Sequence, residues 1–192
     1  MADQDKRRYR RADETRKVVL DVAGKLFYEH GIRAIGIDRV AEEAGVTTTT
    51  LYRLFGSKDG LIAAYLEAAD RDWFTWFEAS GGARLDDIGR FFDELEVQAG
   101  RQDYRGCPFR MALAEYPSAG SEVHKVATNN KRRTRQRFLE MAAEAGMSEP
   151  GLVADQLMVL VDGICASATE RTPDSPGGIA TTLLRQIVAT AG

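Results

Sequence analysis

The stretch IDRVAEEAGVTTTTLYRLF, residues 37–55, decides the fold. Apolar residues recur three and four positions apart on both sides of Gly45, which predicts two short helices over residues 37–44 and 47–55. Gly45 tolerates the positive φ angle of a sharp turn, and the small Ala41 lets the two helix backbones approach each other. The sequence therefore predicts a helix-turn-helix.

Helical spacing of apolar residues continues through the rest of the chain, and no stretch alternates with the period of a strand for long enough to predict one. The helix before residue 37 is predicted over 13–30, with a cap from Asp13 or Thr15 and with Val18 on its buried face. The other helices are predicted from 58, capped by Ser57, to about 80, and over about 85–99, 108–116, 122–145, 150–169 and 178–190, the last after a breaker at 172–178. The fold class is thus all-α, with helix lengths that fit a bundle.

The second helix of the motif presents polar side chains on its outward face. Threonine can hydrogen-bond to base edges or phosphates, and a tyrosine hydroxyl can donate to a phosphate. A new helix begins at Ser57-Lys58, where free backbone N–H groups and a cation lie together and suit a phosphate. The alternative is an ordinary helical hairpin in a bundle, with a polar turn over 47–50. The candidate DNA-contacting residues are Thr47, which also caps the helix, Thr48, Thr49, Thr50, Tyr52, Arg53 and Lys58.

Charge is unevenly distributed along the 192 residues. Residues 1–60 hold 12 Lys and Arg against 10 Asp and Glu, and residues 61–192 hold 14 against 19, so the net charge of −3 averages a basic start with an acidic remainder. In the basic N-terminal arm, Arg8, Arg10 and Arg11 are candidates to reach neighbouring phosphates or the minor groove. A solvated arm that touches no DNA is the alternative.

The run KLFYEHGIRAIGIDRVAEEAGVTTTTLYRLFGSKDGL, residues 25–61, resembles the DNA-binding domain of TetR-type transcriptional repressors. The chain differs from many members at Gly36, where Ser or Thr often caps the motif, and at Leu54, where many have a histidine that contacts a phosphate. The matching residues are Phe27, Gly31, Val40, Ala41, Ala44, Gly45, Val46, Leu51, Tyr52, Phe55, Lys58 and Leu61.

The resemblance implies a domain order and an assembly. Residues 1–56 would form a three-helix DNA-binding domain with its basic arm, and residues 57–192 a linking helix and a helical-bundle domain for effector binding and dimerisation. The protein would bind a palindromic operator in double-stranded DNA as a homodimer, act as a repressor and be released by an unknown small molecule. The family's dimer face usually comes from the last two long helices, here with Leu157, Leu160, Val161, Ile164, Leu184 and Ile187, side chains that suit a core equally well.

An aromatic group at helical spacing marks the C-terminal half of the chain. Core packing is one interpretation, and the wall of an apolar ligand pocket is the other. Cys107 precedes a proline that fits the first position of a helix, where a thiol can become reactive. A redox sensor and a purely structural turn are the two interpretations of this segment. The candidate ligand-contacting residues are Trp73, Trp76, Phe77, Phe92, Cys107, Phe109 and Met111.

Other function classes lack support in the sequence. It contains no P-loop, G-x-G-x-x-G, G-x-S-x-G or H-E-x-x-H motif, so we expect neither an enzyme nor a cofactor. Two cysteines and two isolated histidines predict no metal site. No run approaches about 20 apolar residues and no secretory signal is present, so we expect a cytoplasmic protein without a membrane partner. The alternatives to a regulator are an all-helical enzyme and a ligand-carrying bundle that no longer binds DNA.

Overall fold

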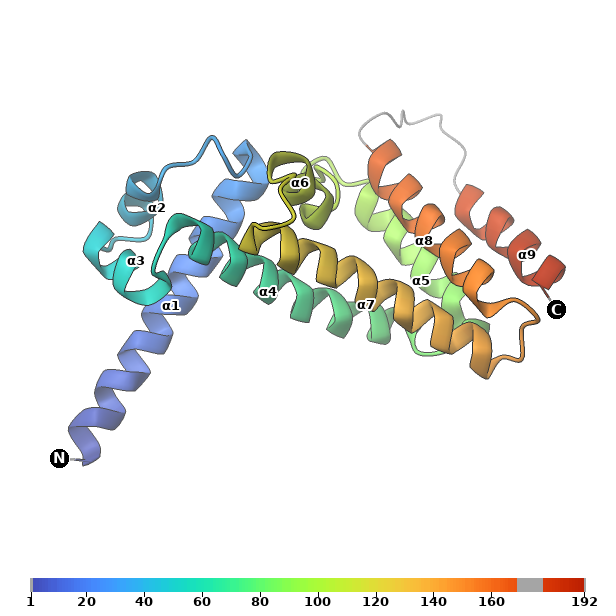
Figure 1. Ribbon diagram of the computed structural model, residues 1–192, viewed down its shortest axis with the longest axis horizontal. Helices are drawn as coiled ribbons and strands as arrows, with labels where there is room; N and C mark the ends of the chain where they lie inside the picture. Colours follow the sequence, from blue (N-terminus) through green and yellow to red (C-terminus); the bar gives the residue numbers. More distant parts are fainter. Residues whose placement is uncertain (1, 169–177, 192) are drawn as a thin grey trace. The chain divides into compact units, whose positions relative to one another are not determined.

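The computed structural model describes residues 2–168 and 178–191, with the side chains of 12–168, 178 and 180–189 (Figure 1). All regular elements in these ranges are helices, which confirms the predicted all-α fold. The predicted breaker at 172–178 lies, apart from Gly178, outside the described residues.

The chain divides into two compact units. We call Met1–Ala69 with Met111–Ala127 the head unit, and Asp70–Arg110 with Thr128–Gly192 the body unit. The sequence places a boundary between residues 56 and 57, which divides DNA binding from effector binding and dimerisation. It does not coincide with the division into compact units, and it stays a prediction. The helices that contribute residues to both units are α4 (Lys58–Phe77), α6 (Pro108–Glu115) and α7 (Glu122–Glu144).

The head unit is built on α1 (Ala2–His30), α2 (Ile37–Glu43), α3 (Thr48–Phe55) and the first turns of α4. Helix α1 packs one apolar face into this core. Its Phe27 ring contacts the Tyr65 ring of α4, with 5.8 Å between the two centroids. The fully or almost fully buried residues of the core include Val19, Ala23, Leu26, Phe27, Ile32, Ile35, Val40, Ala41, Leu51, Leu61, Ile62 and Leu66.

Helix α1 differs from the prediction at its start. It begins at Ala2 instead of residue 13, so neither Asp13 nor Thr15 caps it. The preceding residues contain neither proline nor glycine, and nothing in them stops a helix. Val18, predicted on the buried face, is 49% exposed because its neighbour Val19 faces the core and successive side chains of a helix diverge.

Helix α4 ends earlier than predicted. It stops at Phe77 and passes into the π-helical turn η1 (Glu78–Gly82), in which Gly81 has a φ angle of +107°. A Cβ atom on Gly81 would lie 2.5 Å from the backbone oxygen of Asp87, so this close approach also requires glycine.

The remaining body helices agree with the predicted ones to within a few residues. The predicted helix 85–99 opens with a 3-10 turn, η2 (Leu85–Asp87), before α5 (Ile88–Ala99). Helices α8 (Pro150–Ser167) and α9 (Ile179–Ala191) complete the unit. Phe77, Phe91 and Phe138 are completely buried at the centre of the core, which also includes Phe92, Leu95, Met141, Val153, Leu157, Val161, Ile164 and Leu184.

Among the described residues, α8 is the one helix long and apolar enough to cross a membrane by length and composition. Its buried side contributes Val153, Leu157 and Val161 to the core of the body unit. Packing within the protein therefore accounts for much of its apolar character.

Candidate nucleic-acid interface

The turn between α2 and α3 has the geometry that the sequence predicts. Gly45 has a φ angle of +64°, and the amide of Val46 donates to the carbonyl of Ala41 at 2.9 Å. A Cβ atom on Gly45 would meet nothing within 4 Å, so its backbone angle, and not space, requires glycine here. Val40 and Leu51 are completely buried on either side of the turn.

Thr47 caps the start of α3, as predicted. Its side-chain oxygen accepts a hydrogen bond from the amide of Thr50 at 3.2 Å, and the two threonine hydroxyls lie 3.0 Å apart. These two hydroxyls are therefore occupied in holding the first turn of the helix. Gly36, at the start of α2, provides no side-chain cap.

The exposed face of α3 brings together Thr49, Tyr52 and Arg53. The Tyr52 side chain is 49% exposed. Within the described part of the chain, none of these three side chains has a hydrogen-bonding or ion-pair partner. Thr48 is half-buried beside them. Thr49, Tyr52 and Arg53 thus provide a hydroxyl, a phenol and a guanidinium that can bind groups outside the protein.

Arg16 of α1 fixes the other end of α3, a role that the sequence analysis missed. Its guanidinium donates to the carbonyl oxygen of Leu54 at 2.9 Å and lies 4.5 Å from the centroid of the Phe55 ring. This hydrogen bond satisfies one of the last carbonyls of the helix, which have no partner within it. The residues are 38 positions apart in sequence, so no local pattern reveals the contact.

Lys58 lies at the start of α4, next to the predicted cap. The Ser57 hydroxyl accepts from the amide of Gly60 at 2.9 Å, and the Lys58 ammonium donates to the carbonyl of Arg33 at 3.3 Å. An ammonium has three donors, so this one bond leaves Lys58 able to bind a phosphate. The side chains of Arg8, Arg10 and Arg11 lie outside the described residues.

The end of α6 belongs to the head unit and holds the connection between α1 and α2. The carboxylate of Glu115 accepts hydrogen bonds from the amides of Ile32 at 2.9 Å and Arg33 at 2.6 Å. The Arg33 guanidinium lies 5.2 Å from the centroid of the Tyr116 ring. Burial raises the pKa of Tyr116, and the nearby Asp59 carboxylate adds to this effect. No sequence signal indicates the contacts of Ile32 and Arg33 with Glu115 and Tyr116, because these partners are more than 80 residues apart.

Three of the aromatic residues predicted to contact a ligand, Trp73, Trp76 and Phe77, pack with Phe91 in the body unit. The ring centroids of Phe77 and Phe91 are 4.7 Å apart, and those of Trp73 and Trp76 are 5.4 Å apart. Phe77, Phe92 and Phe109 are buried, whereas Trp73, Trp76 and Cys107 are partly exposed. Met111 belongs to the head unit.

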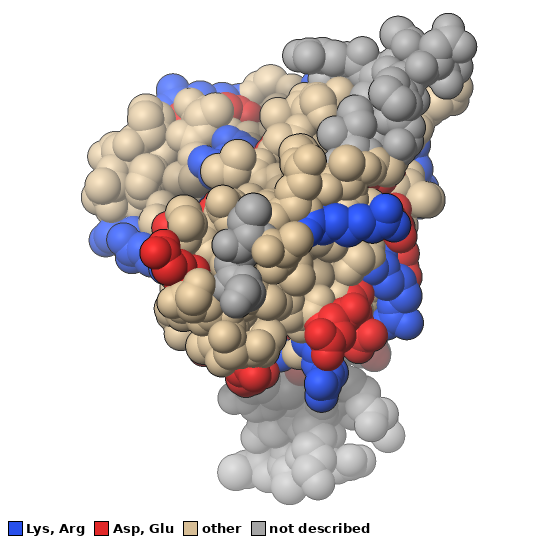
Figure 2. Space-filling model, turned by 90° about the vertical axis from the view of Figure 1, so that its right-hand side faces the viewer, with Lys and Arg blue, Asp and Glu red and all other residues tan. Residues whose placement is uncertain are grey.

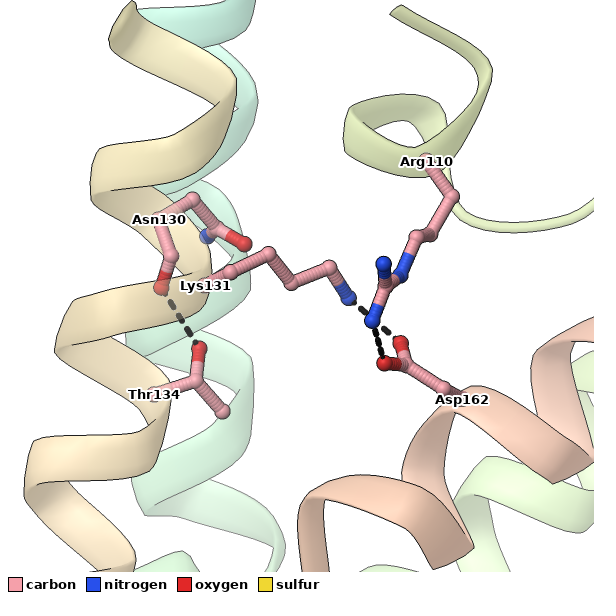
Figure 3. A network of polar contacts seen from close by, with 5 residues as sticks. All are labelled: Arg110, Asn130, Lys131, Thr134 and Asp162. Atoms are coloured by element: carbon pink, nitrogen blue, oxygen red, sulfur yellow. Dashed lines mark hydrogen bonds and ion pairs between the residues drawn. The ribbon is translucent and has the colours of Figure 1, made fainter. Parts of the chain in front are cut away.

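A charged network joins three helices of the body unit (Figure 3). The Asp162 carboxylate of α8 accepts from the Lys131 ammonium of α7 at 2.8 Å and from the Arg110 guanidinium of α6. Burial alone would raise the pKa of Asp162, but these two hydrogen bonds outweigh it and hold the pKa below its usual value. Further along α7, Arg133 pairs with Asp70 and Arg135 with Asp155.

Comparison with known proteins decides the family. Residues 19–65 match the bacterial regulatory proteins of the tetR family. A solved TetR-family transcriptional regulator from Streptomyces coelicolor is 31% identical, with a TM-score of 0.80 over 93% of this chain and 95% of that one. The chain belongs to the TetR family of transcriptional regulators.

Other relatives of this TetR-family chain agree. The HTH-type transcriptional repressor ComR of Escherichia coli is 27% identical over 81% of this chain and 80% of that protein. A TetR transcriptional regulator from Chloroflexus aurantiacus shares the fold, with 20% identity and a TM-score of 0.78 over 94% of this chain and 96% of that one. These relatives are regulators, so the chain belongs among transcriptional regulators and not among enzymes.

The residues of the TetR-family chain predicted for its dimer face lie mostly inside the body unit. Five of the six are at most 9% exposed and pack against their own chain, and Ile187 is half-buried at the edge of that core. Among the described side chains of α8 and α9, the exposed large apolar ones are instead Leu152, Val159 and Leu183. Figure 2 shows the side on which α8 and α9 lie, and most of its coloured surface is neither basic nor acidic. That these two helices carry the dimer face stays a prediction.

No group of three or more His, Cys, Asp or Glu side chains that could hold a metal ion occurs among the described residues of this regulator.

Proposed function

We propose that this TetR-family protein is a cytoplasmic, ligand-responsive repressor that binds a palindromic operator as a homodimer and is released by a small molecule. The observation that carries the DNA-binding part is the exposed face of α3, with Thr49, Tyr52 and Arg53, on a helix held at both ends by Thr47 and Arg16. A rigid helix with unpaired polar side chains suits the major groove of DNA.

The side chains at this face suit two kinds of contact with DNA, to base edges and to phosphates. The Thr49 side chain can reach base edges, where its methyl group suits thymine and its hydroxyl suits several bases. Tyr52, Arg53 and Lys58 suit phosphates, which position the helix without reading sequence. In a two-fold dimer, two such helices would enter successive major grooves, about 34–36 Å apart.

The proposal is tested by selecting bound fragments from the genomic DNA of the source organism with purified full-length protein. We expect a pseudo-palindromic site, with affinity that falls steeply as salt rises because several phosphates are neutralised per dimer. Selection of no sequence at moderate salt would reject the repressor and leave the ligand-carrying bundle as the function.

Two substitutions on α3 should separate reading from positioning. We expect Tyr52→Phe to weaken binding about tenfold on all sequences, because it removes a hydrogen bond to a charged phosphate. Thr49→Ala should instead change which sequences are selected. Each variant controls for the other, and the measurement is affinity for a panel of operator variants. A uniform loss from Thr49→Ala, or a changed preference from Tyr52→Phe, would contradict this division.

The dimer proposal rests on exposed side chains of α8. Leu152, Val159 and Ala166 recur every seven residues and are all exposed, with Leu152 51% and Val159 73% exposed. This spacing places the three on one side of the helix, as in helices that pair with a partner helix. A second copy of the chain, with the same stripe, is the occupant that we propose.

Val159→Glu should therefore shift the protein from dimer to monomer, because it places a charge in an apolar interface. The matched control is Val97→Glu on α5, where the valine is 70% exposed but lies outside the stripe. Both variants should keep the helical circular dichroism of the wild type. Light scattering coupled to gel filtration measures the mass, and a dimeric Val159→Glu variant would reject this interface.

The effector proposal draws on an unsatisfied donor in the aromatic group. The indole nitrogen of Trp73 is buried and has no hydrogen-bond partner among the described residues. Buried donors normally have a partner, because an unpaired one costs about 1–3 kcal/mol. A mainly apolar molecule with an acceptor oxygen would satisfy this nitrogen while it packs against the neighbouring rings.

A further inference from the structure

The two cysteines of the chain lie near each other in the body unit. Arg110 of α6 binds Asp162 of α8. Cys107 precedes Arg110 by three residues, and Cys165 follows Asp162 by three residues. Cys107 lies directly before α6, which begins at Pro108. Asp162 and Cys165 are three residues apart on α8 and so lie on the same side of that helix. The Arg110–Asp162 pair therefore brings the start of α6 to the side of α8 that carries Cys165.

A contact at Gly106 supports this placement. A Cβ atom on Gly106 would lie 3.7 Å from the backbone oxygen of Cys165, so the chain just before Cys107 is packed directly against α8 at Cys165. The φ angle of Gly106 is +109°, which favours glycine at this approach. Both thiols are free in the structure, Cys107 partly exposed and Cys165 6% exposed.

We propose that Cys107 and Cys165 form a dithiol site that hydroperoxides oxidise to a reversible disulfide. Disulfides in cytosolic proteins are usually transient and serve redox sensing or catalysis. Exposure assigns the first step to Cys107, because an oxidant reaches a partly exposed sulfur before a buried one. Burial raises the pKa of Cys165 to about 11, so this cysteine remains a thiol and acts second.

The reaction balances with a hydroperoxide as the oxidant. The Cys107 thiolate attacks one peroxide oxygen, the O–O bond breaks, and the leaving oxygen takes up a proton as water or alcohol. The sulfur of Cys165 then attacks the sulfenic sulfur of Cys107, and the S–O bond breaks. The Cys165 proton leaves with that hydroxide as water. The two thiols lose two electrons and two protons, which the peroxide gains.

The disulfide would tie the start of α6 to α8. The same eight-residue helix carries Glu115, whose carboxylate binds the amides of Ile32 and Arg33 in the head unit. A constraint on one end of a short helix changes the positions open to its other end. Oxidation would therefore alter operator affinity, and this part of the inference rests on the proposed DNA-binding function.

The chemical test uses the reduced full-length protein and one to a few equivalents of hydrogen peroxide. We expect the intact mass to fall by two hydrogen atoms, a peptide map without reductant to link Cys107 to Cys165, and dithiothreitol to restore both thiols. Cys107→Ser and Cys165→Ser should each prevent the link. Oxygen addition at Cys107 without a link, cross-links between chains alone, or no change in mass would each overturn the dithiol site.

The functional test measures operator affinity before and after oxidation. We expect at least about a fivefold change in the wild type, no change in Cys165→Ser, and a linked but unresponsive protein in Glu115→Gln. A disulfide that leaves the wild-type affinity unchanged would overturn the regulatory half of the inference. If the reduced protein selects no DNA, the proposed function fails, while the mass measurement still decides the dithiol site.

Discussion

Replacing Phe77 with alanine is expected to lower the free energy of unfolding by about 3–5 kcal/mol. Phe77 is completely buried, and its ring centroid lies 4.7 Å from that of Phe91 and 5.6 Å from that of Phe138. Gly82 lies so close that a Cβ atom there would be 2.5 Å from the Phe77 ring. Deletion of the ring removes these contacts and leaves a cavity that its neighbours can fill only in part.

Urea denaturation followed by circular dichroism measures this effect. The control is Val97→Ala on α5, where the valine is 70% exposed and we expect a change within about 0.5 kcal/mol. A loss below about 1 kcal/mol for Phe77→Ala would mean that the ring borders open space and not a packed core. The experiment thus also separates the two interpretations that the sequence leaves open for the aromatic group.

Gly60→Ala is expected to disable the head unit, with a loss of about 2 kcal/mol or more in stability and operator binding weakened more than tenfold. A Cβ atom on Gly60 would lie 2.1 Å from the backbone oxygen of Phe55. Because this neighbour is backbone, relief requires movement of the turn between α3 and α4. That movement would displace both Lys58 and the end of α3 from their positions at the DNA.

The matched control is Gly151→Ala in the first turn of α8, where a Cβ atom meets nothing within 4 Å. Alanine at an unstrained helical position usually adds about 0.4–1 kcal/mol of stability. Thermal unfolding and operator affinity are measured for both variants. Wild-type affinity in Gly60→Ala would show that the turn moves without consequence for α3, contrary to the expectation.

Local patterns predict the helices well and their ends less well. Apolar spacing locates α2 and α3 to within one residue, because Gly45 and Gly56 leave the helical conformation with positive φ angles. The start of α1 is missed because spacing identifies only the part of a helix that meets a core. The end of α4 is missed because the close approach of Gly81 to Asp87 depends on tertiary packing.

In the candidate site, too, local patterns predict some residues and miss those whose contacts depend on tertiary packing. The exposed face of α3 is predictable, since helical periodicity and the position of Leu51 fix which side chains point outward. Arg16 and Glu115 are not, because their partners are distant in sequence and are backbone groups that any residue provides. Periodicity also identifies the apolar side of α8 without telling whether the same chain or a second copy covers it. Leu157 and Val161, for which the sequence left both interpretations open, lie in the core of their own chain.

The way in which α3 is held has a consequence for redesign. Its first turn is fixed by the Thr47–Thr50 hydroxyl pair and its last by Arg16, so neither support uses the side chains of Thr49 or Arg53. Those two positions can be exchanged without loss of packing within the protein. The head unit is therefore suited to directed evolution of operator preference, in which a library at position 49 is screened for new target sequences, and substitutions at position 53 adjust overall affinity, on an unchanged scaffold.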